Sequence, residues 1–163
     1  MSDAHVVHFA CHGSADLAIP SQSGLVLLED DEESAEGGGG TEKLTISRIS
    51  NANIRQGFVA YLSACSTAEI NTEMLVDEVL HVAAGFQAAG FRHVLASLWP
   101  VRDDVSVAAA RAFYSYLVTH LAEDADQDDV VARAAHYATA ELRNTRKFKK
   151  QPLHWVNFVH FGV

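Results

Sequence analysis

Short, continuous apolar runs are the feature of this sequence that most restricts its fold. Three of them, at 5–10, 58–63 and 93–98, are about six residues long and contain valine, phenylalanine and tyrosine. Runs of this length and composition predict strands. They lack the polar alternation of a half-exposed strand, so they favour a parallel sheet that is covered on both faces. Two further strands are predicted at 21–28 and 155–161.

Segments with helical spacing lie between these runs. Residues 74–89 place apolar side chains on one helical face, and Gly90 follows where a helix would end. Two further helices are predicted at 105–120 and 128–143, and Asp103 or Asp104 is expected to cap the first of these. Strands that alternate with helices indicate an α/β fold with a mostly parallel sheet and helices on both faces.

Composition restricts the compartment and the partners. The chain has 163 residues, which is the size of one domain, and a formal net charge of −9, which disfavours binding to nucleic acid. No apolar stretch approaches the roughly 20 residues of a membrane span, and no signal peptide is visible. With only two cysteines, a disulfide scaffold is not expected. We therefore expect a cytoplasmic protein that requires neither a cofactor nor a membrane.

One segment differs from the rest in composition. Residues 29–40 are acidic and end in four glycines, so they cannot bury enough apolar surface to order themselves. A flexible loop is predicted here. It is not a phosphate-binding loop, because no Gly-Lys-Ser or Gly-Lys-Thr closes the glycine run.

Polar residues follow three of the predicted strands. His12 and Gly13 follow the first, Cys65 follows the second, and residues 99–104 follow the third. Parallel strands place their carboxyl ends at one sheet edge, and neighbouring strands lie about 4.8 Å apart. A thiol nucleophile requires a nearby base, which His12 would supply to Cys65. The N–H groups of Gly13 and Cys65 are candidates for an oxyanion hole.

Other readings of these residues remain open. Cys11 is expected to pack in the core, since alternation turns it away from His12. A zinc site from His8, His12 and Cys65 is disfavoured, because two residues four apart on one strand are about 13 Å apart. A redox or metal-binding protein that uses Cys11 and Cys65 is disfavoured by the same alternation.

The residues after the third strand also have two readings. Trp99 is either a wall of a substrate pocket or a core aromatic residue. Asp103 and Asp104 either line that pocket or cap the helix that follows them.

Five ordered blocks resemble the CHAT domain family, whose fold is similar to that of caspases and separase. The blocks are HFACHG (8–13), YLSACST (61–67), AAGFRHVLASLWPVRDD (88–104), RAFYSYL (111–117) and HWVNFVHFGV (154–163). The resemblance implies a single domain over 1–163 with a caspase-like three-layer sandwich. It implies that His12 is the base and Cys65 the nucleophile of a cysteine endopeptidase of the caspase and separase clan.

The resemblance also implies a larger context. Members of the family usually begin upstream of the His-Gly strand, so we expect this chain to be the C-terminal part of the full domain, with an apolar edge at 5–10. Such proteins often carry helical repeats of the tetratricopeptide (TPR) type, which are expected as partners. The alternative is a non-catalytic interaction module. Asp103 and Asp104, together with separase's preference for arginine, predict cleavage of a protein or peptide after Arg or Lys.

Overall fold

The computed structural model describes residues 5–16, 18–28, 40–63, 65–66, 72–122 and 126–162; at 65–66 and 72–79 it describes the backbone alone. The predicted loop at 29–40 lies outside the described residues, except for Gly40. Its two ends are neighbours nonetheless, because Leu28 and Thr41 are paired in adjacent antiparallel strands.

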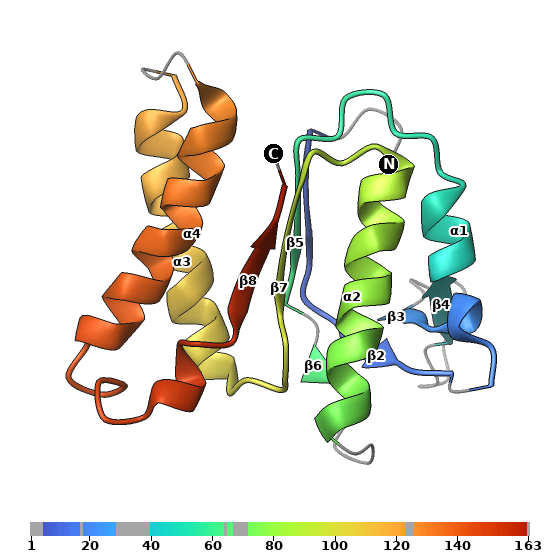
Figure 1. Ribbon diagram of the computed structural model, residues 1–163, viewed down its shortest axis with the longest axis horizontal. Helices are drawn as coiled ribbons and strands as arrows, with labels where there is room; N and C mark the ends of the chain where they lie inside the picture. The colour runs from blue at the N-terminus through green and yellow to red at the C-terminus, as the bar shows by residue number, and fades with distance from the viewer. Residues whose placement is uncertain are drawn as a thin grey trace, which may run out of the picture.

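The central sheet has four strands in the order β1 (Val6–Phe9), β5 (Val59–Leu62), β7 (His93–Ser97) and β8 (Phe158–Phe161). The first three are parallel, and β8 is antiparallel to β7 (Figure 1). The three apolar runs of the sequence form the parallel strands. The predicted final strand is shorter than expected, because a 3-10 helix, η2 (Pro152–His154), and a turn precede it.

A second sheet, which the sequence analysis did not predict, continues from the carboxyl ends of β1 and β5. Its order is β4 (Thr41–Thr45), β3 (Gly24–Leu28), β2 (His12–Ser14) and β6 (Cys65–Ser66). The chain bends at Ala10 and Cys11 between β1 and β2. Strands as short as β2 and β6 carry no apolar pattern, so the sequence gives no sign of them. A 3-10 helix, η1 (Pro20–Gln22), precedes β3.

The described part of the chain has four α-helices. They are α1 (Ile46–Ser50), α2 (Thr72–Ala89), α3 (Asp103–His120) and α4 (Gln127–Asn144). Helix α1 packs against α2 and β4, and the other three lie against the central sheet. The sequence predicts that Asp103 or Asp104 caps α3, and this prediction is wrong. The helix begins at Asp103, Arg102 occupies the N-cap position, and no side chain caps it. Both aspartates lie in the first turn, where the helix dipole favours negative charge. No helix in the described part of the chain could cross a membrane.

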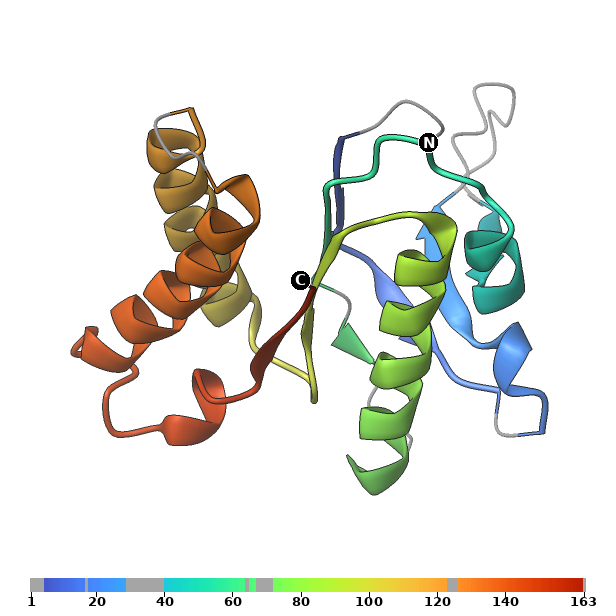
Figure 2. The ribbon, with the colours of Figure 1, turned by 45° about the horizontal axis from the view of Figure 1, so that its top comes forward.

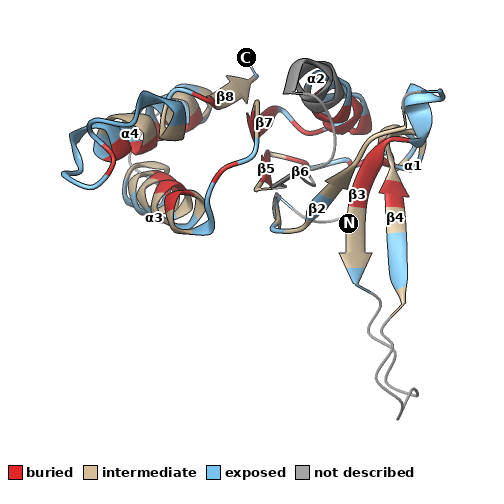
Figure 3. Ribbon diagram, turned by 90° about the horizontal axis from the view of Figure 1, so that it is seen from below, coloured by how far each residue is buried: buried red, intermediate tan, exposed pale blue. Residues whose placement is uncertain are grey.

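Helices lie on both faces of the sheet, giving three layers (Figures 1 and 2). On the side of α2, Phe86 packs against Leu62 and Val94 in one buried cluster. On the opposite side, Phe113 and the buried residues of α4 pack with Tyr61 and Leu95. Figure 3 shows buried residues concentrated in β5 and β7, between the two helical layers. The mixed α/β fold with a mostly parallel central sheet agrees with the sequence analysis.

The edge of the central sheet at β1 is partly apolar, as expected. In the described part of the chain β1 pairs only with β5, and Val6 is 42% exposed. The carboxyl end of this strand leads directly into the residues of the candidate site.

Candidate active site

His12 and Cys65 occupy paired positions in the second sheet. β2 and β6 run parallel, with His12 opposite Cys65 and Gly13 opposite Ser66. Neighbouring strands lie about 4.8 Å apart, so the two backbones bring a histidine and a cysteine next to each other. Gly13 also pairs with Leu25 on the other side of β2. The topology of the fold thus joins two residues that are 53 positions apart in the sequence.

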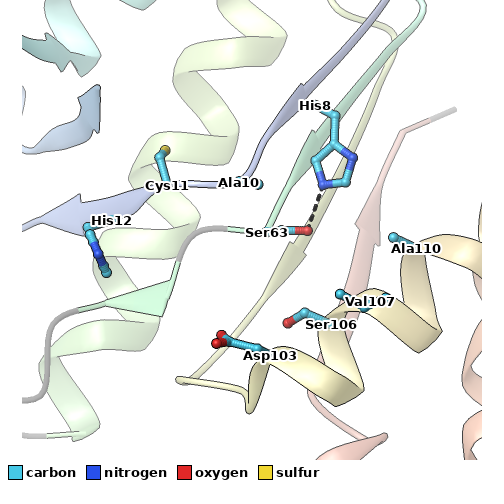
Figure 4. Close-up of a pocket in the computed structure, with 9 residues that line it drawn as sticks. All are labelled: His8, Ala10, Cys11, His12, Ser63, Asp103, Ser106, Val107 and Ala110. Atoms are coloured by element: carbon cyan, nitrogen blue, oxygen red, sulfur yellow. Dashed lines mark hydrogen bonds between the residues drawn. The ribbon is translucent and has the colours of Figure 1, made fainter. Parts of the chain in front are cut away.

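A cavity of about 490 Å³ opens beside His12 (Figure 4). One wall comes from β1, β2 and the residues next to them, and the other comes from the first two turns of α3. The residues that line it are His8, Ala10, Cys11, His12, Ser63, Asp103, Ser106, Val107 and Ala110. Its volume is in the range of small-molecule and side-chain pockets. A peptide side chain would fit between the sheet edge and the helix.

His8 is a residue of this cavity that the sequence analysis did not assign to the site. Its Nε2 atom lies 2.8 Å from Oγ of Ser63, two positions before Cys65. Its ring centroid lies 4.7 Å from that of Tyr61 and 5.7 Å from that of Tyr114. The side chain remains exposed, yet desolvation by this packing lowers the pKa of its imidazole. In the sequence, the one signal that could have pointed to His8 is that it is a polar residue within an otherwise apolar strand, directly after two valines.

Cys11 has two neighbourhoods. It packs against the hydrophobic cluster around Phe86, as expected for a core cysteine, and it also lines the cavity. Burial raises the pKa of its thiol, so at neutral pH the sulfur is protonated and weakly nucleophilic. Among the described residues, no group of three histidine, cysteine or acidic side chains is placed to hold a metal ion.

The two aspartates differ in their surroundings. Asp103 lines the cavity. Asp104 faces the turn after α4, where its Oδ1 accepts a hydrogen bond from Arg102 Nε at 3.1 Å and its Oδ2 accepts one from Lys147 Nζ. The hydrogen bond from Lys147, with help from Arg102, lowers the pKa of the Asp104 carboxyl. The two neighbouring carboxylates therefore have separate surroundings.

Trp99 is also engaged elsewhere. Its Nε1 donates a hydrogen bond to the carbonyl oxygen of Leu153 at 3.0 Å, which ties the end of β7 to η2. It is not among the residues that line the cavity in the described part of the chain. Of the three residues predicted to bind substrate, the structure brings Asp103 to the cavity beside His12.

Comparison with known proteins places this arrangement in a family. A segment of 97 residues, 60% of the chain, is 32% identical to human tetratricopeptide repeat protein 28. The match covers 4% of that much longer protein. The model of the CHAT domain matches residues 1–163. The chain therefore belongs to the CHAT domain family, which is part of a cysteine peptidase-like clan.

Proposed function

We propose that this chain is a cysteine endopeptidase in which Cys65 is the nucleophile and His12 the general base. The observation that carries the proposal is the register of β2 and β6, which pairs these two residues. A dyad requires the thiol and the imidazole to reach one another, and adjacent strands supply that proximity. Membership of a cysteine peptidase-like clan supports the same assignment.

The proposed reaction follows the chemistry of an activated thiol. His12 accepts the Cys65 proton, and the thiolate attacks the peptide carbonyl carbon. The N–H groups of Gly13 and Cys65 would stabilise the oxyanion of the tetrahedral intermediate. As the C–N bond breaks, the imidazolium gives its proton to the leaving amine. His12 then deprotonates a water molecule, which hydrolyses the thioester and releases the free thiol.

We further propose that the residue before the cleaved bond is basic. Asp103 offers a carboxylate at the cavity wall, and in the described part of the chain no cationic side chain pairs with it. Arg or Lys in the cavity would form a charge-assisted hydrogen bond there. The net charge of −9 also disfavours the approach of acidic peptides. With two cysteines and no disulfide scaffold the chain suits a reducing compartment, so we propose action in the cytoplasm.

The dyad is tested by trapping and by turnover. A peptidyl electrophile with Arg at its reactive end should alkylate Cys65, identified by peptide mapping. Cys65→Ala should abolish cleavage of an Arg fluorogenic peptide, and His12→Ala should cost nearly as much, because residues that act as a unit are not additive. Cys11 is the matched control for labelling: burial raises the pKa of its thiol, so it should not be alkylated. Alkylation at Cys11 in place of Cys65 would refute the assignment.

A second candidate function is a non-catalytic module that binds helical repeats. The likeness to a tetratricopeptide repeat protein favours it. Under this alternative, Cys65→Ala would leave the biological output unchanged while variants that abolish binding to a TPR-like region would remove it. Under the proposed function, Cys65→Ala would bind the same region and lose the output.

A further inference from the structure

The cavity holds an ionisable side chain that the proposed reaction does not use. His8 lies on β1, and Asp103 lies across the cavity in the first turn of α3 (Figure 4). Ser63 lies between them in this view and is hydrogen-bonded to His8. His8 and Asp103 thus line the same cavity, so a cationic side chain bound there lies in the field of an imidazole that is neutral or cationic, depending on pH.

We propose that His8 is a specificity-determining residue that admits a cationic substrate side chain when its imidazole is neutral and rejects it when protonated. This inference rests on the proposed function, because it concerns the same cavity and the same basic residue. Protonated His8 would act in two ways. It would repel the substrate cation, and it would compete with that cation for the carboxylate of Asp103.

The groups around His8 support this role. From β5, Tyr61 packs on the ring and Ser63 bonds to it; from α3, Tyr114 packs on the ring. Burial raises the pKa of Tyr61, and it raises that of Tyr114 to about 12, so both phenols stay neutral. The other titratable groups that line the cavity are Cys11, His12 and Asp103. Asp103 is thus the one carboxylate among the residues that line it in the described structure.

The direction of the pH effect follows from the surroundings of His8. Desolvation lowers the pKa of its imidazole from the ordinary 6.5, so the ring is neutral at pH 7.5 and gains its proton in mildly acidic solution. We therefore expect the preference for a basic residue to weaken as the pH falls below this range.

The experiment compares two peptides that differ only at the residue before the cleaved bond, arginine or its neutral isostere citrulline. The ratio of their kcat/KM values is measured between pH 5.5 and 8. Ionisation of the dyad affects both peptides equally and cancels in this ratio. In the wild type the ratio should fall roughly fivefold toward pH 5.5. His8→Gln, whose amide retains a hydrogen-bonding group near Ser63, should give a pH-independent ratio. His136→Gln, exposed on α4, is the control and should behave as the wild type.

A ratio that does not change with pH in the wild type, or that falls equally in His8→Gln, would overturn the role of His8. If neither peptide is cleaved, it is the proposed function that has failed. In that case the binding of the two peptides to the Cys65→Ala variant is measured by calorimetry. The ratio of their Kd values then replaces the ratio of kcat/KM values as the test of the inference. A loss of arginine binding at pH 5.5 that His8→Gln restores would support it. Absence of binding at both pH values would refute it.

Discussion

Nδ1 of His93 lies 3.0 Å from Nε2 of His160, and Nε2 of His93 lies 2.9 Å from Oδ1 of Asp128. His93 is fully buried at the start of β7. Arg92 pairs with the other carboxylate oxygen of Asp128. A row of one carboxylate and two imidazoles thus joins β7, β8 and the first turn of α4. It lies away from the candidate site, so its effect should be on stability.

We predict that the fold loses stability in mild acid partly through His160. Burial, together with the neighbouring His93, lowers the pKa of the His160 imidazole from 6.5. A histidine whose pKa is lower in the folded state contributes stability above its unfolded pKa, and this contribution is lost as the pH falls through the folded value. His160→Gln should therefore flatten the dependence of the melting temperature on pH below 6.5. The measurement is differential scanning calorimetry between pH 5 and 8.

Part of this acid dependence should persist in His160→Gln, because the pKa of His8 is lowered in the same direction. The exposed residue His136 supplies the control, since His136→Gln should retain the dependence of the wild type. A His160→Gln variant with the full acid dependence of the wild type would show that this imidazole is not a source of it.

Phe113 should be the most costly residue of α3 to truncate. Its side chain is 0% exposed, and its ring contacts those of Tyr61 and Tyr114. Phe113→Ala removes these contacts and leaves a cavity, so the free energy of unfolding should fall by about 3–5 kcal/mol. On the same helix Val118 is 76% exposed, and Val118→Ala should change the free energy of unfolding by less than about 0.5 kcal/mol. Urea denaturation of both variants checks the pair.

Gly90 ends α2 with a backbone that favours glycine. Its φ is +114°, and a Cβ atom at this position would lie 2.2 Å from the carbonyl oxygen of Ile54. Gly90→Ala should lower the free energy of unfolding by more than about 1 kcal/mol, because the backbone conformation and the contact both oppose a side chain. Gly85→Ala, within α2, is the comparison, because a Cβ atom at that position would lie 3.2 Å from its nearest atom, Cγ2 of Ile46. A Gly90→Ala variant as stable as the wild type would contradict the prediction.

The sequence predicted the central sheet well because each strand there is apolar on both faces. The three long helices, α2, α3 and α4, were found within two residues at each end, since their spacing and flanking residues are distinct. The second sheet as such was missed, although its strand β3 lies within the strand predicted at 21–28. β2 is His-Gly-Ser and β6 is two residues, so these strands depend on pairing with β3 and with each other, which no local pattern encodes.

In the candidate site too, some residues could be predicted from the sequence and others depend on tertiary contacts. His12 and Cys65 were placed on neighbouring strands from the order of strand ends, and the structure pairs their backbones. His8 was not selected, because one histidine in an apolar strand has no periodicity that points to a cavity. Asp103 and Asp104 could not be separated either. Adjacent residues on a helix point about 100° apart, and only tertiary contacts such as Lys147 decide which one faces the cavity.

Asp103 and Asp104 provide a matched pair for testing substrate preference. Both lie in the first turn of α3, so each substitution removes one negative charge from the same helix terminus. Asp103→Asn should reduce the preference for arginine over citrulline by about tenfold or more, the effect of losing a hydrogen bond to a charged group. Asp104→Asn should leave the preference nearly unchanged, because Arg102 and Lys147 already engage that carboxylate. Steady-state kcat/KM values at pH 7.5, where His8 is neutral, supply the measurement. An arginine preference that survives Asp103→Asn, or cleavage after aspartate, would mean that the cavity wall at α3 does not select the substrate.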